Sequence, residues 1–149
     1  MSRSTVGRPM EILLVEDNLE DARVTIQSLK QENVPCRVTL VRDGEEAMDF
    51  LRREGVFARV PRPDLILLDM ELPKKDGRQV LAEIRGDDRL QNIPVVVLTA
   101  SQVHRVVLQA ESLHVDGFMT KPVSLEQFIQ VIKSLHRLWL AEIILPTME

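Results

Sequence analysis

Acidic residues at the ends of two apolar runs are the positions where this sequence could do chemistry. Asp69 closes the run at 65–68, and Glu16 and Asp17 follow a similar run at 12–15. A carboxylate is costly to bury without a partner, so packing does not explain its place there. If the runs are parallel strands, their carboxyl ends share one edge of a sheet, where ligands bind. Three carboxylates at one edge repel unless a cation lies between them, so we expect a hard-cation site centred on Asp69.

Two further polar residues stand at the ends of apolar runs, and together with the carboxylates they supply the groups that one type of reaction requires. Thr99 closes the apolar, valine-rich run at 95–98, and Lys121 follows the short run at 117–120. A carboxylate nucleophile, a hydroxyl, an ammonium and a divalent cation are what transfer of a phosphoryl group requires. Oxygen ligands of this kind suit Mg²⁺, with Mn²⁺ as a possible substitute.

Each of these residues also has a structural interpretation when it is taken alone. Asp17 or Asn18 could cap a helix after the first run, and Thr99 could cap another. Lys121 could be a solvated surface cation. The coincidence of all of them at successive strand ends is what favours the phosphoryl site.

The elements that must position these residues follow from the alternation of apolar runs with amphipathic stretches. We expect strands at 11–15, 37–41, 64–68, 94–99 and 117–120, and helices at 21–32, 45–53, 78–85, 103–113 and 125–140. Five such units predict an α/β, flavodoxin-like doubly wound fold with a five-stranded parallel sheet and an extended C-terminal helix or tail. We assign 1–9 to an N-terminal tail, 10–140 to the domain and 141–149 to an apolar extension.

Composition limits the function classes. The 149 residues suffice for one domain, and the hydrophobic and charged shares, 44% and 28%, are ordinary for a globular protein. No apolar stretch is long enough to span a bilayer, and the N-terminus lacks a secretory signal. The single Cys36 fits a reducing cytosol. The net charge of −4 argues against nucleic-acid binding, so we expect a cytoplasmic protein without membrane or nucleic-acid partners.

The pattern resembles the receiver domains of two-component response regulators, from about residue 10 to about residue 140. The matching motifs occupy 12–18, 68–73 with 76–77, 98–100 and 120–122. Four motifs in the right order at matching strand ends are far more specific than any one of them.

The resemblance implies the roles of the individual residues. Asp69 would be phosphorylated by a sensor histidine kinase, and Thr99 and Lys121 would contact the phosphoryl oxygens. Glu16, Asp17 and Asp69 would hold Mg²⁺ together with the backbone carbonyl of Glu71. It also implies a cis peptide bond before Pro122, since only proline tolerates that isomer readily.

Three departures from the family pattern bear on mechanism. Glu16 stands where Asp is commoner, and its longer arm still reaches a metal. The aromatic residue that changes rotamer on activation falls on Phe118, since the chain contains no Tyr. Phosphorylation would draw Thr99 toward Asp69, let Phe118 turn inward, and reshape the surface of the fourth helix, fifth strand and fifth helix. Glu71, two residues past Asp69, is a candidate for tuning the lifetime of the phosphoryl group by acting on the attacking water.

The C-terminal stretch 138–145 is apolar nearly all round, so one buried stripe cannot accommodate it. We expect a homodimer through the fourth and fifth helices, with an interface formed by Val106, Val107, Val131, Leu138, Trp139 and Leu145. The alternative is a tail that folds back on the core of its own chain.

A finer resemblance concerns the partner. The segments 52–62 and 73–78 and the tail ending at Pro146 look like those of the stand-alone regulators paired with bacterial, notably cyanobacterial, phytochromes. The predicted function is therefore a phosphorylated signalling protein, not an enzyme, whose kinase is of phytochrome type. Two alternatives stay open: an aspartyl-phosphate phosphatase of haloacid-dehalogenase type, and a receiver that acts as a constitutive dimeric adaptor.

Overall fold

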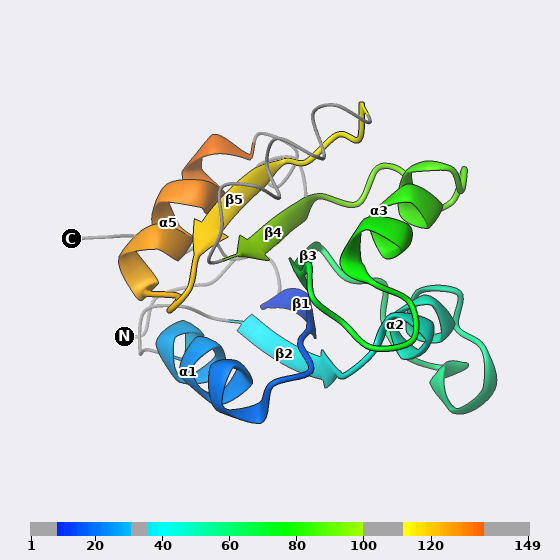
Figure 1. The fold of residues 1–149 in the computed structure, drawn as a ribbon, viewed down its shortest axis with the longest axis horizontal. Helices are drawn as coiled ribbons and strands as arrows, with labels where there is room; N and C mark the ends of the chain where they lie inside the picture. The colour runs from blue at the N-terminus through cyan, green and yellow to red at the C-terminus, as the bar shows by residue number, and fades with distance from the viewer. Residues whose placement is uncertain (1–8, 31–35, 100–111, 136–149) are drawn as a thin grey trace, which may run out of the picture.

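A parallel five-stranded sheet forms the centre of the computed structural model, which describes residues 9–30, 36–99 and 112–135 (Figure 1). The strands lie in the order β2-β1-β3-β4-β5, and every neighbouring pair is parallel. The expected sheet is confirmed. Its strands are β1 (Met10–Val15), β2 (Cys36–Val41), β3 (Leu65–Asp69), β4 (Val95–Thr99) and β5 (Gly117–Thr120).

Helices cover both faces of the sheet, as a doubly wound fold requires (Figure 1). The elements are α1 (Leu19–Leu29), α2 (Gly44–Leu51), the 3-10 turn η1 (Gly55–Phe57), α3 (Gly77–Arg85) and α5 (Leu125–Ser134). Helices α1 and α5 lie on one side of the sheet, and α2 and α3 lie on the other.

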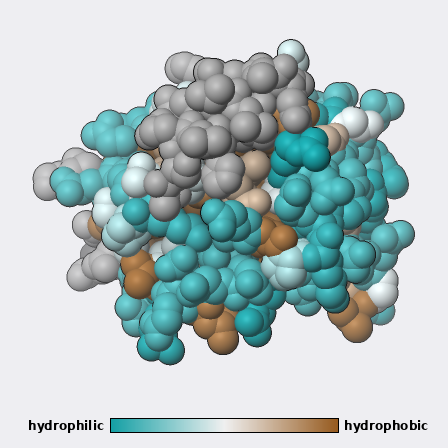
Figure 2. Space-filling view, in the orientation of Figure 1, coloured by the Kyte–Doolittle hydropathy of each residue, from teal (hydrophilic) through white to brown (hydrophobic). Residues whose placement is uncertain are grey.

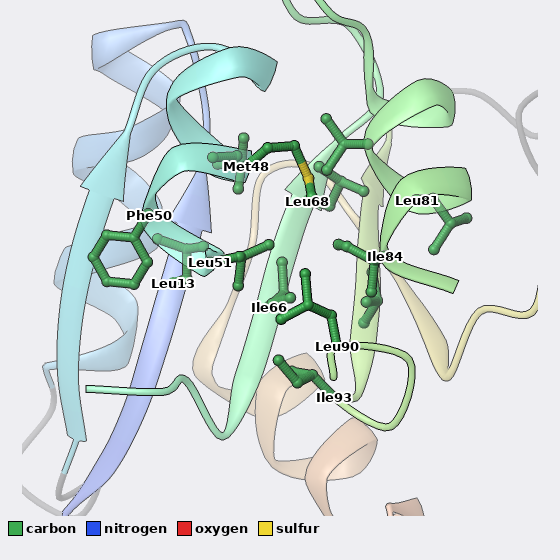
Figure 3. Close-up of a cluster of buried hydrophobic side chains, with 14 of the residues drawn as sticks. Leu13, Met48, Phe50, Leu51, Ile66, Leu68, Leu81, Ile84, Leu90 and Ile93 are labelled. Atoms are coloured by element: carbon green, nitrogen blue, oxygen red, sulfur yellow. The ribbon is translucent and has the colours of Figure 1, made fainter. Parts of the chain in front are cut away.

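The core consists of two apolar layers, because alternate residues of a strand point to opposite faces. In β3, Ile66 and Leu68 belong to the layer against α2 and α3, whereas Leu65 and Leu67 face α1 and α5. Figure 3 shows the first layer, in which side chains of both helices meet those of the sheet. A strand buried on both faces explains the unbroken apolar runs in the sequence.

Polar side chains cap the amino-terminal ends of the helices α1, α2, α3 and α5. Asn18, Asp43, Asp76 and Ser124 each accept a hydrogen bond from the backbone N–H three residues further on. A capping residue of this kind typically contributes about 1 kcal/mol to helix stability. The capping alternative is thus correct for Asn18, and it leaves Asp17 for another role.

Several expected helix bounds were wrong. Helix α1 starts at Leu19, two residues before the expected start, because Asn18 caps it, and it ends at Leu29 instead of continuing to 32. Helix α5 ends at Ser134 instead of 140: the Leu135 backbone leaves the helical region. No Gly or Pro marks that end in the sequence. The helix expected at 103–113 lies, but for its last two residues, outside the described residues.

The surface of the described part is mostly hydrophilic, with small separate apolar patches (Figure 2). Within that part, no helix combines the length and apolar character that crossing a membrane demands. The predicted boundary between 140 and 141 lies outside the described residues.

Candidate functional site

The carboxyl ends of β1, β3, β4 and β5 meet at one edge of the sheet and bring the predicted residues together. A cavity of about 320 Å³ opens there. Its lining consists of polar or charged side chains only: Glu16, Asp17, Asn18, Asp21, Asp69, Glu71, Thr99 and Lys121. Six of these eight were candidates from sequence, so the predicted convergence is confirmed.

One ammonium group holds the acidic residues of this cavity together. Nζ of Lys121 lies 2.8 Å from Glu16 Oε1, 3.2 Å from Asp21 Oδ2 and 3.3 Å from Asp69 Oδ2. Sequence reasoning missed Asp21. A signal for it existed, because the Asn18 cap places Asp21 on the first turn of α1, which starts at this edge. A single positive charge thus serves three carboxylates.

Among these groups, Glu16 has the least favourable environment for a negative charge. It is fully buried, and its Oε2 accepts a 3.2 Å hydrogen bond from the backbone N–H of Asn18. Burial raises the pKa of Glu16 to about 7, helped by the neighbouring Asp69 and opposed in part by Lys121. Burial alone would lower the pKa of Lys121, but the contacts with Glu16 and Asp69 raise it, so the ammonium stays charged.

The segment after β3 holds Asp69 in place. Its Oδ1 accepts a 3.3 Å hydrogen bond from the backbone N–H of Glu71, and its side chain is nearly buried. Helix α3 begins directly against this segment: a Cβ on Gly77 would lie 2.5 Å from the carbonyl oxygen of Asp69. Only glycine permits that approach. The start of α3 therefore fixes the backbone that carries the carboxylate.

Comparison with known proteins agrees with this geometry. The family model for the response regulator receiver domain matches residues 12–133. The chain belongs to this family of receivers. It is 43% identical over 138 residues to the response regulator Rcp1 of Synechocystis sp., an alignment that covers 93% of this chain and 94% of Rcp1.

Solved structures of phytochrome response regulators are similar to this receiver. The phosphorylated cyanobacterial phytochrome response regulator RcpA has 47% identity and a TM-score of 0.73, with 93% of this chain and 99% of RcpA covered. The bacteriophytochrome response regulator AtBRR has 38% identity and a TM-score of 0.81, with 87% and 94% covered. The Mn²⁺-bound form of Rcp1 has 42% identity and a TM-score of 0.71, with 93% and 100% covered. Receivers of this family are generally signalling proteins rather than catalysts, which disfavours the phosphatase alternative.

The chemistry of the donors in this receiver suits a divalent cation. Glu16, Asp17, Asp69 and the Glu71 carbonyl offer only oxygen, which hard cations prefer. One carboxylate oxygen, Glu16 Oε1, is buried and makes no hydrogen bond of good geometry, with the Lys121 ammonium as its counter-charge. Among the described residues no three His, Cys, Asp or Glu side chains already surround one point. The chemistry of the donor set therefore fits a hard divalent cation.

The remaining predicted residues are only partly covered by the structure. Phe118 is half-buried and packs against the apolar layer of α2 and α3. Val131 is half-buried on α5 against the opposite layer. The other expected interface residues, Val106, Val107, Leu138, Trp139 and Leu145, lie outside the described residues. The cis peptide bond between Lys121 and Pro122 is confirmed.

Proposed function

We propose that this receiver is a signalling switch that accepts a phosphoryl group on Asp69 from a sensor histidine kinase. The observation that carries the proposal is the placement of Asp69 in the polar cavity, 3.3 Å from the Lys121 ammonium and in the same lining as Thr99. Asp69 is the last residue of the central strand β3, beside β4, which carries Thr99. Family membership supports the same role.

The reaction uses each residue in a defined way. A carboxylate oxygen of Asp69 attacks the phosphorus while the bond between phosphorus and the kinase histidine nitrogen breaks, and the electron pair leaves with that nitrogen. Lys121 offsets charge on the phosphoryl oxygens, and the Thr99 hydroxyl donates to one of them. Hydrolysis of the acyl phosphate by water later returns the carboxylate and releases inorganic phosphate.

A divalent cation, Mg²⁺ or Mn²⁺, would be held by Glu16, Asp17, Asp69 and the carbonyl of Glu71. When bound, it supplies positive charge to the oxygens of the phosphoryl group. The Mn²⁺-bound form of the relative Rcp1 supports a metal in this receiver. Such a cation would add to the positive charge that Lys121 alone supplies to Glu16, Asp21 and Asp69.

Phosphorylation by a small phosphodonor tests the switch against the constitutive adaptor. Acetyl phosphate with Mg²⁺ should label the wild-type protein, and Asp69→Asn should abolish the labelling because amide nitrogen does not attack phosphorus. Asp88→Asn, an exposed position outside the cavity, is the matched control and should label normally. Absence of labelling in the wild type would favour the adaptor, and steady release of phosphate from small esters would favour the phosphatase.

The kinase partner is proposed to be of phytochrome type. Similarity to RcpA and AtBRR, both named as phytochrome response regulators, supports this pairing. Transfer of labelled phosphate from purified kinases is the direct test. A phytochrome-type kinase should phosphorylate the wild-type receiver faster than unrelated kinases do, and equal rates would contradict the pairing.

The output is proposed to be a population shift of the surface formed by the fourth helix, β5 and α5. Thr99 moving toward the phosphoryl group leaves space for Phe118, which lies on the neighbouring strand β5. We also propose a homodimer through this surface, supported by the apolar residues at 138–145 in the sequence. Light scattering should give twice the monomer mass at high micromolar concentration, and Leu138→Glu should give the monomer mass. A wild-type monomer at that concentration would contradict the dimer.

A further inference from the structure

Arginines gather at the amino edge of the sheet, opposite the edge that holds Asp69. A cavity of about 190 Å³ lies between the end of α2, the segment before β3 and the turn after α3. Four arginines and one aspartate contribute its charges, over a floor of two leucines: Arg52, Arg53, Arg62, Arg89, Asp87, Leu51 and Leu90. A net positive cavity is unexpected in a protein whose total charge is −4.

The charge of these arginines is not balanced locally. Arg52 pairs with Glu83 at 3.4 Å and Asp87 at 3.7 Å, which uses the only carboxylate of the cavity. Among the described residues no carboxylate pairs with the side chains of Arg53, Arg62 or Arg89. The carboxyl ends of α2 and α3 also point to this edge, but each helix end offsets only about half a charge. About two positive charges therefore remain.

The cavity is organised before any ligand arrives. Nη1 of Arg62 donates a 2.5 Å hydrogen bond to the carbonyl oxygen of Arg89, which ties two walls together. Asp87 Oδ1 accepts from the backbone N–H of Arg89 at 2.8 Å and fixes the turn that carries it. Leu51 and Leu90 belong to the buried apolar layer drawn in Figure 3. The guanidinium of Arg62 is thus held in place, and arginine forks match oxyanions such as phosphate.

One of these arginines stands where the backbone favours glycine. Arg53 has φ of 57°, and it follows α2 at the point where the N–H groups of Arg53 and Glu54 bond back to Phe50 and Asp49. Helices that end in this way usually place glycine at such a position. The fold alone would thus be better served by a residue without a side chain here, which indicates that the guanidinium has another use.

We propose that this cavity binds a small anion bearing one or two phosphoryl groups, separately from the Asp69 site. Its volume accommodates such a group with a small organic body and does not admit a folded partner. Arg53, Arg62 and Arg89, which have no carboxylate partner among the described residues, supply the recognition, and the two leucines receive the apolar part of the ligand.

Calorimetric titration with pyrophosphate, at constant ionic strength and with a chelator to keep the protein free of metal, tests the proposal. Wild-type protein should bind, and Arg53→Gly and Arg89→Gln should each bind at least about ten-fold more weakly. Arg59→Gln removes the same charge from an exposed position outside the cavity and should bind within about two-fold of wild type, because salt screens distant charges.

Thermal unfolding separates binding from folding. Arg53→Gly should melt at the wild-type temperature or a few degrees above it, because glycine relieves the positive φ. Weaker binding by a variant that is at least as stable supports the site. No binding by the wild type would overturn the proposal, and so would equal affinities of Arg53→Gly, Arg89→Gln and wild type, which would place pyrophosphate elsewhere.

Discussion

Two charged clusters occupy opposite edges of the same sheet, and they balance their charges differently. At the amino edge, Arg85 makes four hydrogen bonds: to the carbonyls of His114, Gln91 and Ile93, and to Oδ2 of Asp116 at 2.8 Å. Asp116 Oδ2 also accepts from the backbone N–H at the start of β4. Almost every donor of this guanidinium has a partner.

At the carboxyl edge, by contrast, the carboxylates outnumber the positive charge that faces them. The single ammonium of Lys121 faces Glu16, Asp21 and Asp69, and burial raises the pKa of Glu16 to about 7. We call a network saturated when nearly all of its charges and hydrogen-bonding groups have partners. A saturated network stabilises the fold, whereas an unsaturated one can bind ligands that bring positive charge or compete for the ammonium. This difference separates the structural cluster from the functional one more clearly than burial does, because both lie largely below the surface.

The largest effect should come from breaking the saturated cluster. Asp116→Ala leaves the mostly buried Arg85 without its counter-charge, so we expect the free energy of unfolding in urea to fall by about 3–5 kcal/mol. The Asp116→Ala protein should still be labelled on Asp69 by acetyl phosphate at urea concentrations well below its unfolding transition. Asp88→Ala, an exposed aspartate, is the control and should cost little. A loss below about 1 kcal/mol for Asp116→Ala would remove the distinction between the two clusters.

At the unsaturated cluster around Lys121, we expect a substitution to raise the stability of the metal-free protein instead of lowering it. Because the folded pKa of Glu16 lies above its ordinary value of 4.5, the folded protein binds that proton more tightly than the unfolded chain does. Stability of the metal-free protein should therefore fall as pH rises from about 4.5 to about 7, and level off above. Glu16→Gln should remove this fall and stabilise the metal-free protein at pH 8 by about 2–3 kcal/mol.

The same variant should weaken the binding of Mg²⁺, since one carboxylate is lost from the proposed metal site. Urea unfolding across pH, with chelator and with Mg²⁺, measures both effects. A Glu16→Gln protein that is less stable than wild type at about pH 8 without metal would show that the cluster is structural after all.

A smaller effect is expected from the exposed acid beside Asp69. If Glu71 orients the water that hydrolyses the phosphoryl group, Glu71→Ala should slow dephosphorylation by about three- to ten-fold. Glu71→Gln keeps the length of the side chain and a hydrogen-bonding oxygen, so it should retain more of the rate. Decay of labelled protein after removal of the donor is the measurement. Unchanged decay in Glu71→Ala would end this hypothesis.

The smallest effect should come from Asp21, whose half-exposed carboxylate shares Lys121. Exposed ion pairs contribute at most about 1 kcal/mol. Asp21→Asn removes one negative charge beside the incoming phosphodonor, and we expect labelling by acetyl phosphate to speed up by about two- to three-fold. Glu20→Gln, on the same turn but paired with Arg23, is the matched control. Slower labelling in Asp21→Asn alone would mean that Asp21 helps to position Lys121.

The sequence by itself determined the parallel sheet and the edge at which Glu16, Asp17, Asp69, Thr99 and Lys121 meet. The physical reason is that apolar runs set the strands, and parallel strands necessarily end at one edge. The chemistry of the site could be predicted because polar residues occupy strand-end positions that apolar packing disfavours.

Only the tertiary structure decided which groups share charge. The contact between Asp21 and Lys121 joins residues 100 positions apart, and that between Arg85 and Asp116 joins residues 31 apart. The end of α5 at Ser134 also required the structure, since helix formers continue past it. Pattern and propensity act over a few residues, whereas ion pairs, cavities and helix ends depend on distances that exist only once the chain has folded.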